Sequence, residues 1–543
     1  TSVVHRSPND DAIALLKQSG INIEIVDEEK IFVKGSRQQH HKINDAAATQ
    51  LFKGLTRLKK CSALSIDLSG CGYQITSQGL TVIAAALPKL VDLKYLEINM
   101  RGCGVGDTGS TALSVSIPKL IALKKLKLIF NDCKKISDKA LYEFGESISK
   151  TSLTDLELGF AGCIKITDKG LNWLSSSLGK ISKTPGLNKL TLNFQSCDKI
   201  TDSGMSKLVT LFQDLPWVET LDLNFDHCNK LTNSSITVMC NAMEKSMNAS
   251  SMIKFFNIKN LNLAFGSCDK LDNRALTMIA EQISKLNQLE VLGLDFSYCE
   301  NITDSGLSEF SKTVIRLKST LKNIKLNFQG CERITETGVI DISLFISNLT
   351  NLSGLKLVLS DCKKLGDDVI GVLSIKLCSL PSLKHLHLSF SRCGEIGDDS
   401  LSGLAHSLKN LWTIEDLSLH FAYCSDIGNN GIQALCESLG SLNSTLSQLK
   451  LNFGHCDKVG DAAIIKLSER LSQFSYLKLL ELHFVACNQI TGEGINALST
   501  AINKLSSIEN LQLYFHGCPQ IDESAKSNLQ RAGSRAPQHY VFI

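Results

Sequence analysis

The stretch that decides the fold is residues 156–171, Leu-Glu-Leu-Gly-Phe-Ala-Gly-Cys-Ile-Lys-Ile-Thr-Asp-Lys-Gly-Leu. The same phrase recurs about fifteen times, mostly at steps of 30 to 32 residues. Its first apolar residue stands at Leu64, Leu96, Leu126, Leu156, Leu190, Leu221, Leu261, Leu292, Ile324, Leu355, Leu386, Leu417, Leu449, Leu480 and Leu511. A repeat of this length predicts one elongated body in place of the three or four domains that 543 residues would otherwise suggest.

The two limbs of each repeat have different periodicities. Alternation over Leu-x-Leu-x-Phe predicts a half-buried strand, because successive side chains point to opposite faces. After the cysteine, segments such as 204–212 carry apolar residues at helical spacing and predict an amphipathic helix. Asp168 falls where such a helix starts, so we expect its carboxylate to accept free backbone N–H groups there. The small residue three positions after the threonine, Gly170 in this repeat, predicts a close approach of neighbouring helices.

One strand and one helix cannot bury both of their faces, so the repeats must stack. We therefore predict an α/β solenoid, a horseshoe of about 15 units with parallel strands on the concave face and helices on the convex face. Residues 1–60 are expected to form an N-terminal cap and a zeroth repeat, 61–525 the fifteen repeats, and 526–543 a C-terminal cap or tail. Short strands are expected at 22–26 and 30–34. Phe32 is placed near the position equivalent to Leu64, and the charge of Lys526 in an apolar slot predicts that stacking stops there.

Two repeats are longer than the others. Extra residues around 244–256 are expected to bulge near the end of a helix, and the repeat that starts at Leu156 is lengthened near Pro185 and Gly186. Tolerated insertion is the commoner explanation for such loops, and a specific contact is the alternative.

Fifteen of the nineteen cysteines occupy one place in the repeat: Cys71, Cys103, Cys133, Cys163, Cys197, Cys228, Cys268, Cys299, Cys331, Cys362, Cys393, Cys424, Cys456, Cys487 and Cys518. A column of side chains that point the same way does not converge on a metal and does not favour disulfides. Each thiol is therefore expected to be buried, with its S–H donating weakly to the turn backbone. Free thiols in such number favour a reducing, cytoplasmic location. Six glycosylation sequons leave an extracellular location open, at Asn233, Asn248, Asn301, Asn348, Asn351 and Asn443.

The recurring phrase resembles the cysteine-containing class of leucine-rich repeats, in which cysteine takes the place more often held by asparagine. The resemblance covers roughly residues 30–525. In repeat number and in its helix-bearing units the chain is also similar to the ribonuclease inhibitor, although it lacks the alternation of two repeat types. It resembles, in addition, large repeat proteins of single-celled eukaryotes.

Composition argues against several partners. The 57 Lys+Arg and 54 Asp+Glu leave a formal charge of +3, which creates no strong field for nucleic acid. Lysines two residues after the cysteines, such as Lys165 and Lys199, are interleaved with acids and predict a solvated ladder. Apolar stretches such as 82–87 are too short to cross a bilayer. No basic and apolar leader follows Thr1, so a targeting peptide is expected to be absent or already removed.

Two motifs invite a catalytic or cofactor interpretation. Residues 104–109 are a literal G-x-G-x-x-G, but its glycines coincide with glycine and small-residue positions of the repeat, so a structural role is favoured over phosphate binding. Histidines share one face of the last five units, and a polar partner surface is favoured over metal binding or pH sensing: His387, His420, His455, His483 and His516. No acid, base and nucleophile converge, so we expect neither an enzyme nor a cofactor nor a metal.

The predicted concave sheet offers a regular, polar array of exposed side chains. We expect a non-catalytic scaffold that binds one or more protein partners there, through Asp67, Glu97, Asn99, Asn193, Asp222, Asn224, Asp295, Asn327, His420, Tyr423, Asn452, His483 and Tyr514. The alternative is a structural subunit of a filament or a large organelle assembly, in which solenoids self-associate through their ends or outer faces.

Overall fold

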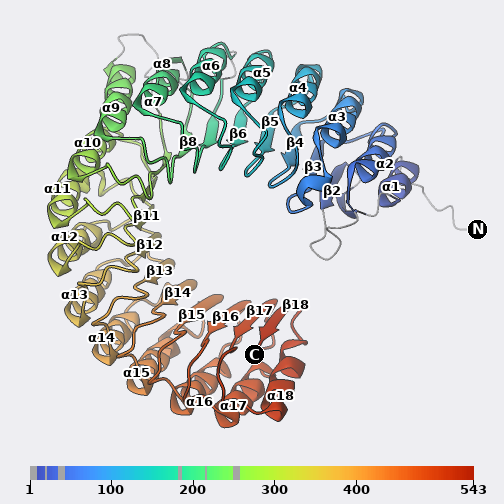
Figure 1. The fold of residues 1–543 in the computed structure, drawn as a ribbon. Coiled ribbons are helices and arrows are strands. Elements are labelled where there is room, and N and C mark those ends of the chain that lie inside the picture. The colour runs from blue at the N-terminus through green and yellow to red at the C-terminus, as the bar shows by residue number, and fades with distance from the viewer. Residues whose placement is uncertain are drawn as a thin grey trace, which may run out of the picture. The chain divides into compact units, whose positions relative to one another are not determined.

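The computed structural model describes residues 9–18, 21–27, 29–34, 43–181, 186–214, 217–248 and 257–543. The chain divides into two compact units, Thr1–Lys270 and Leu271–Ile543, and each is an alternation of strands and helices (Figure 1).

The first unit opens with helix α1 (Asp10–Lys17) and the antiparallel hairpin of β1 (Asn22–Asp27) and β2 (Lys30–Lys34). The elements that follow are α2 (Asp45–Leu55), β3 (Ala63–Asp67), α3 (Ser77–Ala86), β4 (Tyr95–Asn99), α4 (Asp107–Ser116), β5 (Lys125–Ile129), α5 (Asp138–Ile148), β6 (Asp155–Gly159), α6 (Asp168–Leu178), β7 (Lys189–Asn193), α7 (Asp202–Leu208), α8 (Leu211–Asp214), β8 (Thr220–Asn224), α9 (Asn233–Asn248) and β9 (Asn260–Ala264). The helix predicted at 204–212 is thus divided between α7 and α8.

The second unit continues the alternation. Its elements are α10 (Asn273–Ile283), β10 (Val291–Asp295), α11 (Asp304–Val314), β11 (Asn323–Asn327), α12 (Glu336–Ser347), β12 (Gly354–Val358), α13 (Asp367–Leu377), β13 (His385–Ser389), α14 (Asp398–Leu408), β14 (Asp416–His420), α15 (Asn429–Ser438), β15 (Gln448–Asn452), α16 (Asp461–Leu471), β16 (Leu479–His483), α17 (Gly492–Ile502), β17 (Asn510–Tyr514), α18 (Glu523–Gly533) and β18 (Gln538–Phe542).

Apart from the β1–β2 hairpin, the strands of each unit pair in parallel, in the register that the repeat predicts. Leu126 lies opposite Leu156 in the first unit, and Leu386 lies opposite Leu417 in the second. In each unit the strands line the inner side of the curve and the helices the outer side (Figure 1). The predicted α/β leucine-rich-repeat solenoid with parallel strands is therefore confirmed.

A column of phenylalanines forms the centre of the core. In the first unit the rings of Phe130, Phe160, Phe194 and Phe225 stack with centroid separations of 6.1, 5.9 and 5.7 Å, and all four are fully buried. Because each ring packs on the ring of the next repeat, the column joins repeats as well as filling them.

The cysteines are buried beside these rings, as predicted. The thiol of Cys163 donates to the carbonyl of Phe130 at 3.2 Å, and Cys456 donates to Phe421 at 3.3 Å. The acceptor thus belongs to the preceding repeat, and the bond ties the two repeats together. Burial raises the pKa of the Cys362 thiol to about 12, which keeps it protonated.

The helix-start aspartate accepts a backbone N–H as predicted, but that N–H belongs to the next repeat and not to the aspartate's own helix. Thr167 caps its own helix α6, accepting from Lys169 N at 3.2 Å. The two carboxylate oxygens of Asp138, in the preceding repeat, accept from Thr167 N and Thr167 Oγ1 at 2.7 Å each. A Cβ at Gly170 would lie 2.5 Å from Asp138 Oδ1. The neighbouring helices therefore approach closely at Gly170, as predicted, and the Asp138 carboxylate occupies the space that a side chain at this position would need.

The parallel strand pairing extends beyond the fifteen predicted repeats at both ends, to β2 in the predicted zeroth repeat and to β18. In β2, Ile31 pairs with Leu64 and Phe32 with Ser65, so the register is one residue earlier than the spacing suggested. Ile31 and Val33 are buried, which places their side of the strand against the core.

At the other end, stacking does not stop at Lys526. That side chain bonds to Glu523 Oε1 at 2.6 Å on the surface of α18, and β18 then pairs with β17. Because the charge of Lys526 stays at the surface, the parallel strand pairing continues past it to β18.

The lengthened repeat near 244–256 begins with an extension of α9 to Asn248. The rest of that insertion, and Pro185, lie outside the described residues. Within the part of the chain that the structure describes, no helix is both long enough and apolar enough to span a membrane.

Candidate functional site

The strand face of each unit is the surface formed by the first, third and fifth residues of its parallel strands. The predicted binding residues of the first unit lie there and are half-buried: Asp67, Glu97, Asn99, Asn193, Asp222 and Asn224. The second unit places Asp295, Asn327, His420, Asn452, His483 and Tyr514 in the same way. Tyr423 lies in the turn that follows β14 and is 44% exposed.

The asparagine and aspartate column also has a local function that the sequence did not reveal. Asn193 Oδ1 accepts from Gln195 N at 3.0 Å, and Asp295 Oδ1 accepts from Ser297 N at 2.9 Å. These Asx turns fix the backbone after the strand. The same bond recurs at Asp67, Asn99, Asn224, Asn327 and Asn452. One oxygen of each side chain is therefore engaged by its own turn, and some of the other polar atoms bond to neighbouring side chains, as Asn327 Nδ2 does to Asp295 Oδ2 at 2.7 Å.

Glu97 belongs to a row of alternating charges on the first unit's strand face, which we call the charged ladder: Glu97, Lys127 and Glu157. Its carboxylate accepts from Ser65 Oγ at 2.8 Å and from Tyr95 OH at 2.9 Å, and Lys127 Nζ lies 3.2 Å away. Burial alone would raise the pKa of Glu97, but these two hydrogen bonds and the lysine charge lower it overall.

The residue before each repeat cysteine has a left-handed backbone. Ten of these residues are not glycine: Asp132, Ser196, His227, Ser267, Tyr298, Asp361, Arg392, Tyr423, His455 and Ala486. The glycines that stand there elsewhere were the signal available in the sequence: Gly70, Gly102, Gly162, Gly330 and Gly517. A bulky residue in this conformation is uncommon and strained by about 1 kcal/mol. In the ten repeats without glycine at this position, the turn therefore projects a side chain beside the strand face.

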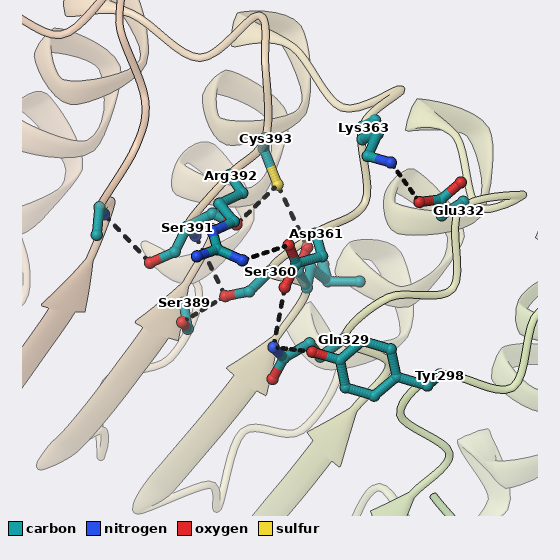
Figure 2. Close-up of polar contacts among 12 residues, drawn as sticks. Tyr298, Gln329, Glu332, Ser360, Asp361, Lys363, Ser389, Ser391, Arg392 and Cys393 are labelled. Atoms are coloured by element: carbon teal, nitrogen blue, oxygen red, sulfur yellow. Dashed lines mark hydrogen bonds and ion pairs between the residues drawn. The ribbon is translucent and has the colours of Figure 1, made fainter. Parts of the chain in front are cut away.

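In the second unit these projecting side chains are connected (Figure 2). Gln329 Nε2 donates to Tyr298 OH at 2.8 Å and to Asp361 Oδ2 at 3.0 Å. Arg392 Nη1 lies 3.8 Å from Asp361 Oδ1, on the other side of the same carboxylate. One polar network thus spans the turns of four consecutive repeats.

Aromatic contacts extend the network. The Arg392 guanidinium lies over the ring of Tyr423, 4.5 Å from its centroid, and the Tyr423 ring stacks on His455 at 4.1 Å with 9° between the planes. Tyr298 is 45% exposed. We call Tyr298, Gln329, Asp361, Arg392, Tyr423 and His455 the turn row.

Small residues and hydroxyl groups hold the turn row in place. A Cβ at Gly330 would lie 2.6 Å from Cε1 of Tyr298, so the Tyr298 ring can pack there only because residue 330 has no side chain. Behind Asp361 the hydroxyls of Ser360 and Ser389 are hydrogen bonded at 2.7 Å, and Ser391 N donates to Ser360 Oγ at 3.2 Å (Figure 2). Glycine packing and these hydrogen bonds therefore support the exposed side chains of the turn row.

The histidines of the second unit do not share one environment. His387 and His420 lie 4.9 Å apart, and burial is the main cause that lowers the pKa of both, that of His387 to about 3. His483 bonds to Glu481 Oε1 at 2.7 Å and stacks on Tyr514 at 4.1 Å. Among the described residues, no group of three or more His, Cys, Asp or Glu is placed to hold a metal ion.

The glycines of the G-x-G-x-x-G motif pack against the preceding repeat. A Cβ at Gly104 would lie 3.1 Å from the carbonyl of Tyr73, and one at Gly109 would lie 2.9 Å from Cα of Ser77. Gly106 N donates to Ser77 Oγ at 2.9 Å. Protein atoms occupy the space and the N–H group that a phosphate would use.

One family model agrees with this architecture over two segments of the chain. A family model described as Leucine Rich repeat matches residues 186–209 and 293–311. The model matches these two segments of the chain, and the fold of the chain is a leucine-rich-repeat solenoid. No curated protein sequence matches it. A chain in the crystal structure of the Rad7 and Elc1 complex in yeast is similar at 16% identity and a TM-score of 0.48, over 89% of this chain and 90% of that one.

Proposed function

We propose that the protein is a non-catalytic, protein-binding scaffold of the cysteine-containing class of leucine-rich repeats. The partner docks on the strand face and turn row of the second unit. The observation that carries this proposal is the turn row, where Tyr298, Arg392 and Tyr423 are held in place at the surface.

Residue type and order both support this surface. Tyrosine and arginine are enriched among the residues that dominate binding energy at protein interfaces. Ordering a flexible side chain on binding costs about 0.5–1.5 kcal/mol. Cation–π and ring-stacking contacts already order Arg392, Tyr423 and His455 in the unbound protein, so much of that cost is removed.

Truncation of the turn row tests the proposal. A partner is first identified by affinity capture and mass spectrometry, and its affinity is then measured by isothermal titration calorimetry. We expect Tyr298→Ala, Arg392→Ala and Tyr423→Ala each to weaken binding by about tenfold or more.

Tyr142 offers a matched control on the helical side of the first unit. It is 43% exposed and contacts Trp173 with ring centroids 5.4 Å apart. Tyr142→Ala should leave the affinity unchanged. Equal affinities for all four variants and the original protein would exclude the turn row as the binding surface.

Charge reversal on the strand face would be a poor test of partner binding. The carboxylate of Glu97 bonds to Ser65 and Tyr95, and that of Asp295 holds the turn after β10. A reversed charge at either position would disturb the fold as well as the surface.

We place this function in a reducing compartment, because the repeat thiols are buried and hydrogen bonded as S–H donors. Mass spectrometry of the protein from its source cell tests the placement, since glycan on Asn301 or Asn351 would contradict it. Sedimentation velocity addresses self-association. A sedimentation coefficient that rises with concentration would favour a structural assembly over a scaffold.

A further inference from the structure

The strand face of the second unit contains a hollow of about 280 Å³ over β11 to β15. Its lining residues include Lys325, Lys356 and Lys450. We call it the basic hollow.

Two of these lysines form an unfavourable pair. Lys325 and Lys356 lie directly opposite each other on β11 and β12, and both are exposed. Like charges at such positions destabilise a sheet. Neither lysine forms an ion pair with another residue of the described part of the chain, whereas Lys450 lies 3.7 Å from Glu481 Oε2.

The first unit shows how this chain neutralises the same position. A hollow of about 220 Å³ lies there on the strand face, and Lys127 in its wall stands between Glu97 at 3.2 Å and Glu157 at 3.4 Å. Lys125 in the same wall lies 3.6 Å from Asp155. The carboxylates that pair with lysines in the first unit are therefore missing around Lys325 and Lys356.

The other polar groups of the basic hollow do not cancel its charge. Burial, and then the charges of His420, Lys356 and Lys450, lower the pKa of His387, so this imidazole is neutral. Asp416 is the one carboxylate among the lining residues, and Glu481 pairs with Lys450, so the charges of Lys325 and Lys356 are not balanced.

The spread of the charges indicates an extended ligand. From Lys325 to Lys450 there are four strand-to-strand steps, roughly 19 Å at about 4.8 Å per step. A single phosphate group cannot contact both ends of that span. An extended peptide of about six residues can, at roughly 3.3 Å per residue.

We propose that the basic hollow binds an acidic, carboxylate-rich segment of a partner protein that lies across β11 to β15. This inference deepens the proposed function, on which it rests, by naming the chemistry of the partner. The carboxylates of the segment supply for Lys325 and Lys356 the countercharges that the first unit supplies internally for Lys127.

Fluorescence anisotropy of the full chain with a labelled hexaglutamate peptide tests the proposal. We expect binding at low salt that weakens as salt is added. The double variant Lys325→Gln/Lys356→Gln should weaken it by about tenfold or more. The matched control Lys125→Gln/Lys189→Gln, in the wall of the first unit's hollow, should leave it unchanged.

Several results would overturn the proposal. They are the absence of hexaglutamate binding, equal losses in both double variants, and competition by inorganic phosphate as effective as competition by unlabelled hexaglutamate. A serine-substituted peptide that binds as well as hexaglutamate would also overturn it, and so would binding that required phosphoserine. Thermal melts exclude misfolding, since removal of the like-charge pair should not lower the melting temperature.

The turn row keeps this inference separable from the proposed function. If Tyr423→Ala weakens binding of the captured partner while Lys325→Gln/Lys356→Gln leaves hexaglutamate binding intact, the scaffold function stands and the acidic segment is excluded. Tyr423→Ala itself should leave hexaglutamate binding unchanged, because Tyr423 does not line the basic hollow.

Discussion

Asp398 and Asp399 stand side by side in the first turn of α14, yet only one of them joins two repeats. Asp398 Oδ1 accepts from Gly428 N of the next repeat at 2.7 Å, whereas Asp399 is exposed. Asp398→Ala should lower the free energy of unfolding by about 1–3 kcal/mol, because a buried N–H group loses its acceptor. Asp399→Ala should change it by less than about 0.5 kcal/mol. Urea unfolding of both variants measures the difference. Equal losses would mean that these carboxylates act only through the helix dipole.

At the same scale, burial controls thiol reactivity. Burial raises the pKa of Cys424 to about 11 and that of Cys362 to about 12, and the thiolate is the reactive form. Cys378 is exposed at the end of α13. Under native conditions at pH 8 we expect a disulfide reagent such as DTNB to modify Cys378 first, and Cys378→Ser to remove this fast phase. Rapid modification of the repeat cysteines in the folded protein would contradict their burial.

At the scale of the element, strand columns distinguish charges that stabilise the sheet from charges that do not. Lys127→Gln removes a lysine that stands between two carboxylates, and it should destabilise the first unit by about 0.2–1 kcal/mol. Lys356→Gln relieves repulsion from Lys325 and should leave stability unchanged or slightly higher. Thermal melts at low and high salt compare the variants, and salt should reduce both effects. A clear loss of stability in Lys356→Gln would mean that its charge serves the fold.

The pH dependence of the first unit's ladder follows from Glu97. Its pKa is lower in the folded protein than in the unfolded chain, so its contribution to stability is present at neutral pH. That contribution is lost as the pH falls through the folded pKa. We expect Glu97→Gln to reduce the melting temperature at pH 7 and to have less effect at the acid end of the range. A loss that did not depend on pH would assign the effect of the substitution to packing.

At the scale of the whole molecule, each repeat is stabilised mainly by the next one. Hydrogen bonds such as Asp398 to Gly428 and Cys456 to Phe421 connect consecutive repeats. The stability of such a stack is close to a sum of nearest-neighbour terms. Hydrogen exchange of Asp398→Ala should therefore rise in α14 and α15 and stay unchanged in residues 43–181. A rise of equal size throughout the chain would show a single cooperative unit.

Periodicity along the chain was sufficient to predict the strands, their parallel register and the burial of phenylalanine and cysteine. These features all depend on which side of a strand or helix faces the core, and the regular spacing of apolar residues along the chain reveals that side directly. It was also sufficient to place Asp295 and His483 on the strand face, as the structure has them.

Tertiary structure decided which atoms meet across repeats. Several contacts join residues about 30 positions apart. Asp138 bonds to Thr167, the Tyr298 ring packs on Gly330, and Ile31 pairs with Leu64. Such contacts depend on the exact position of one repeat relative to the next, and the spacing of residues along the chain does not give that position. The repeat register already places Lys325 and Lys356 in one column, but the hollow around them depends on how the side chains of neighbouring strands pack.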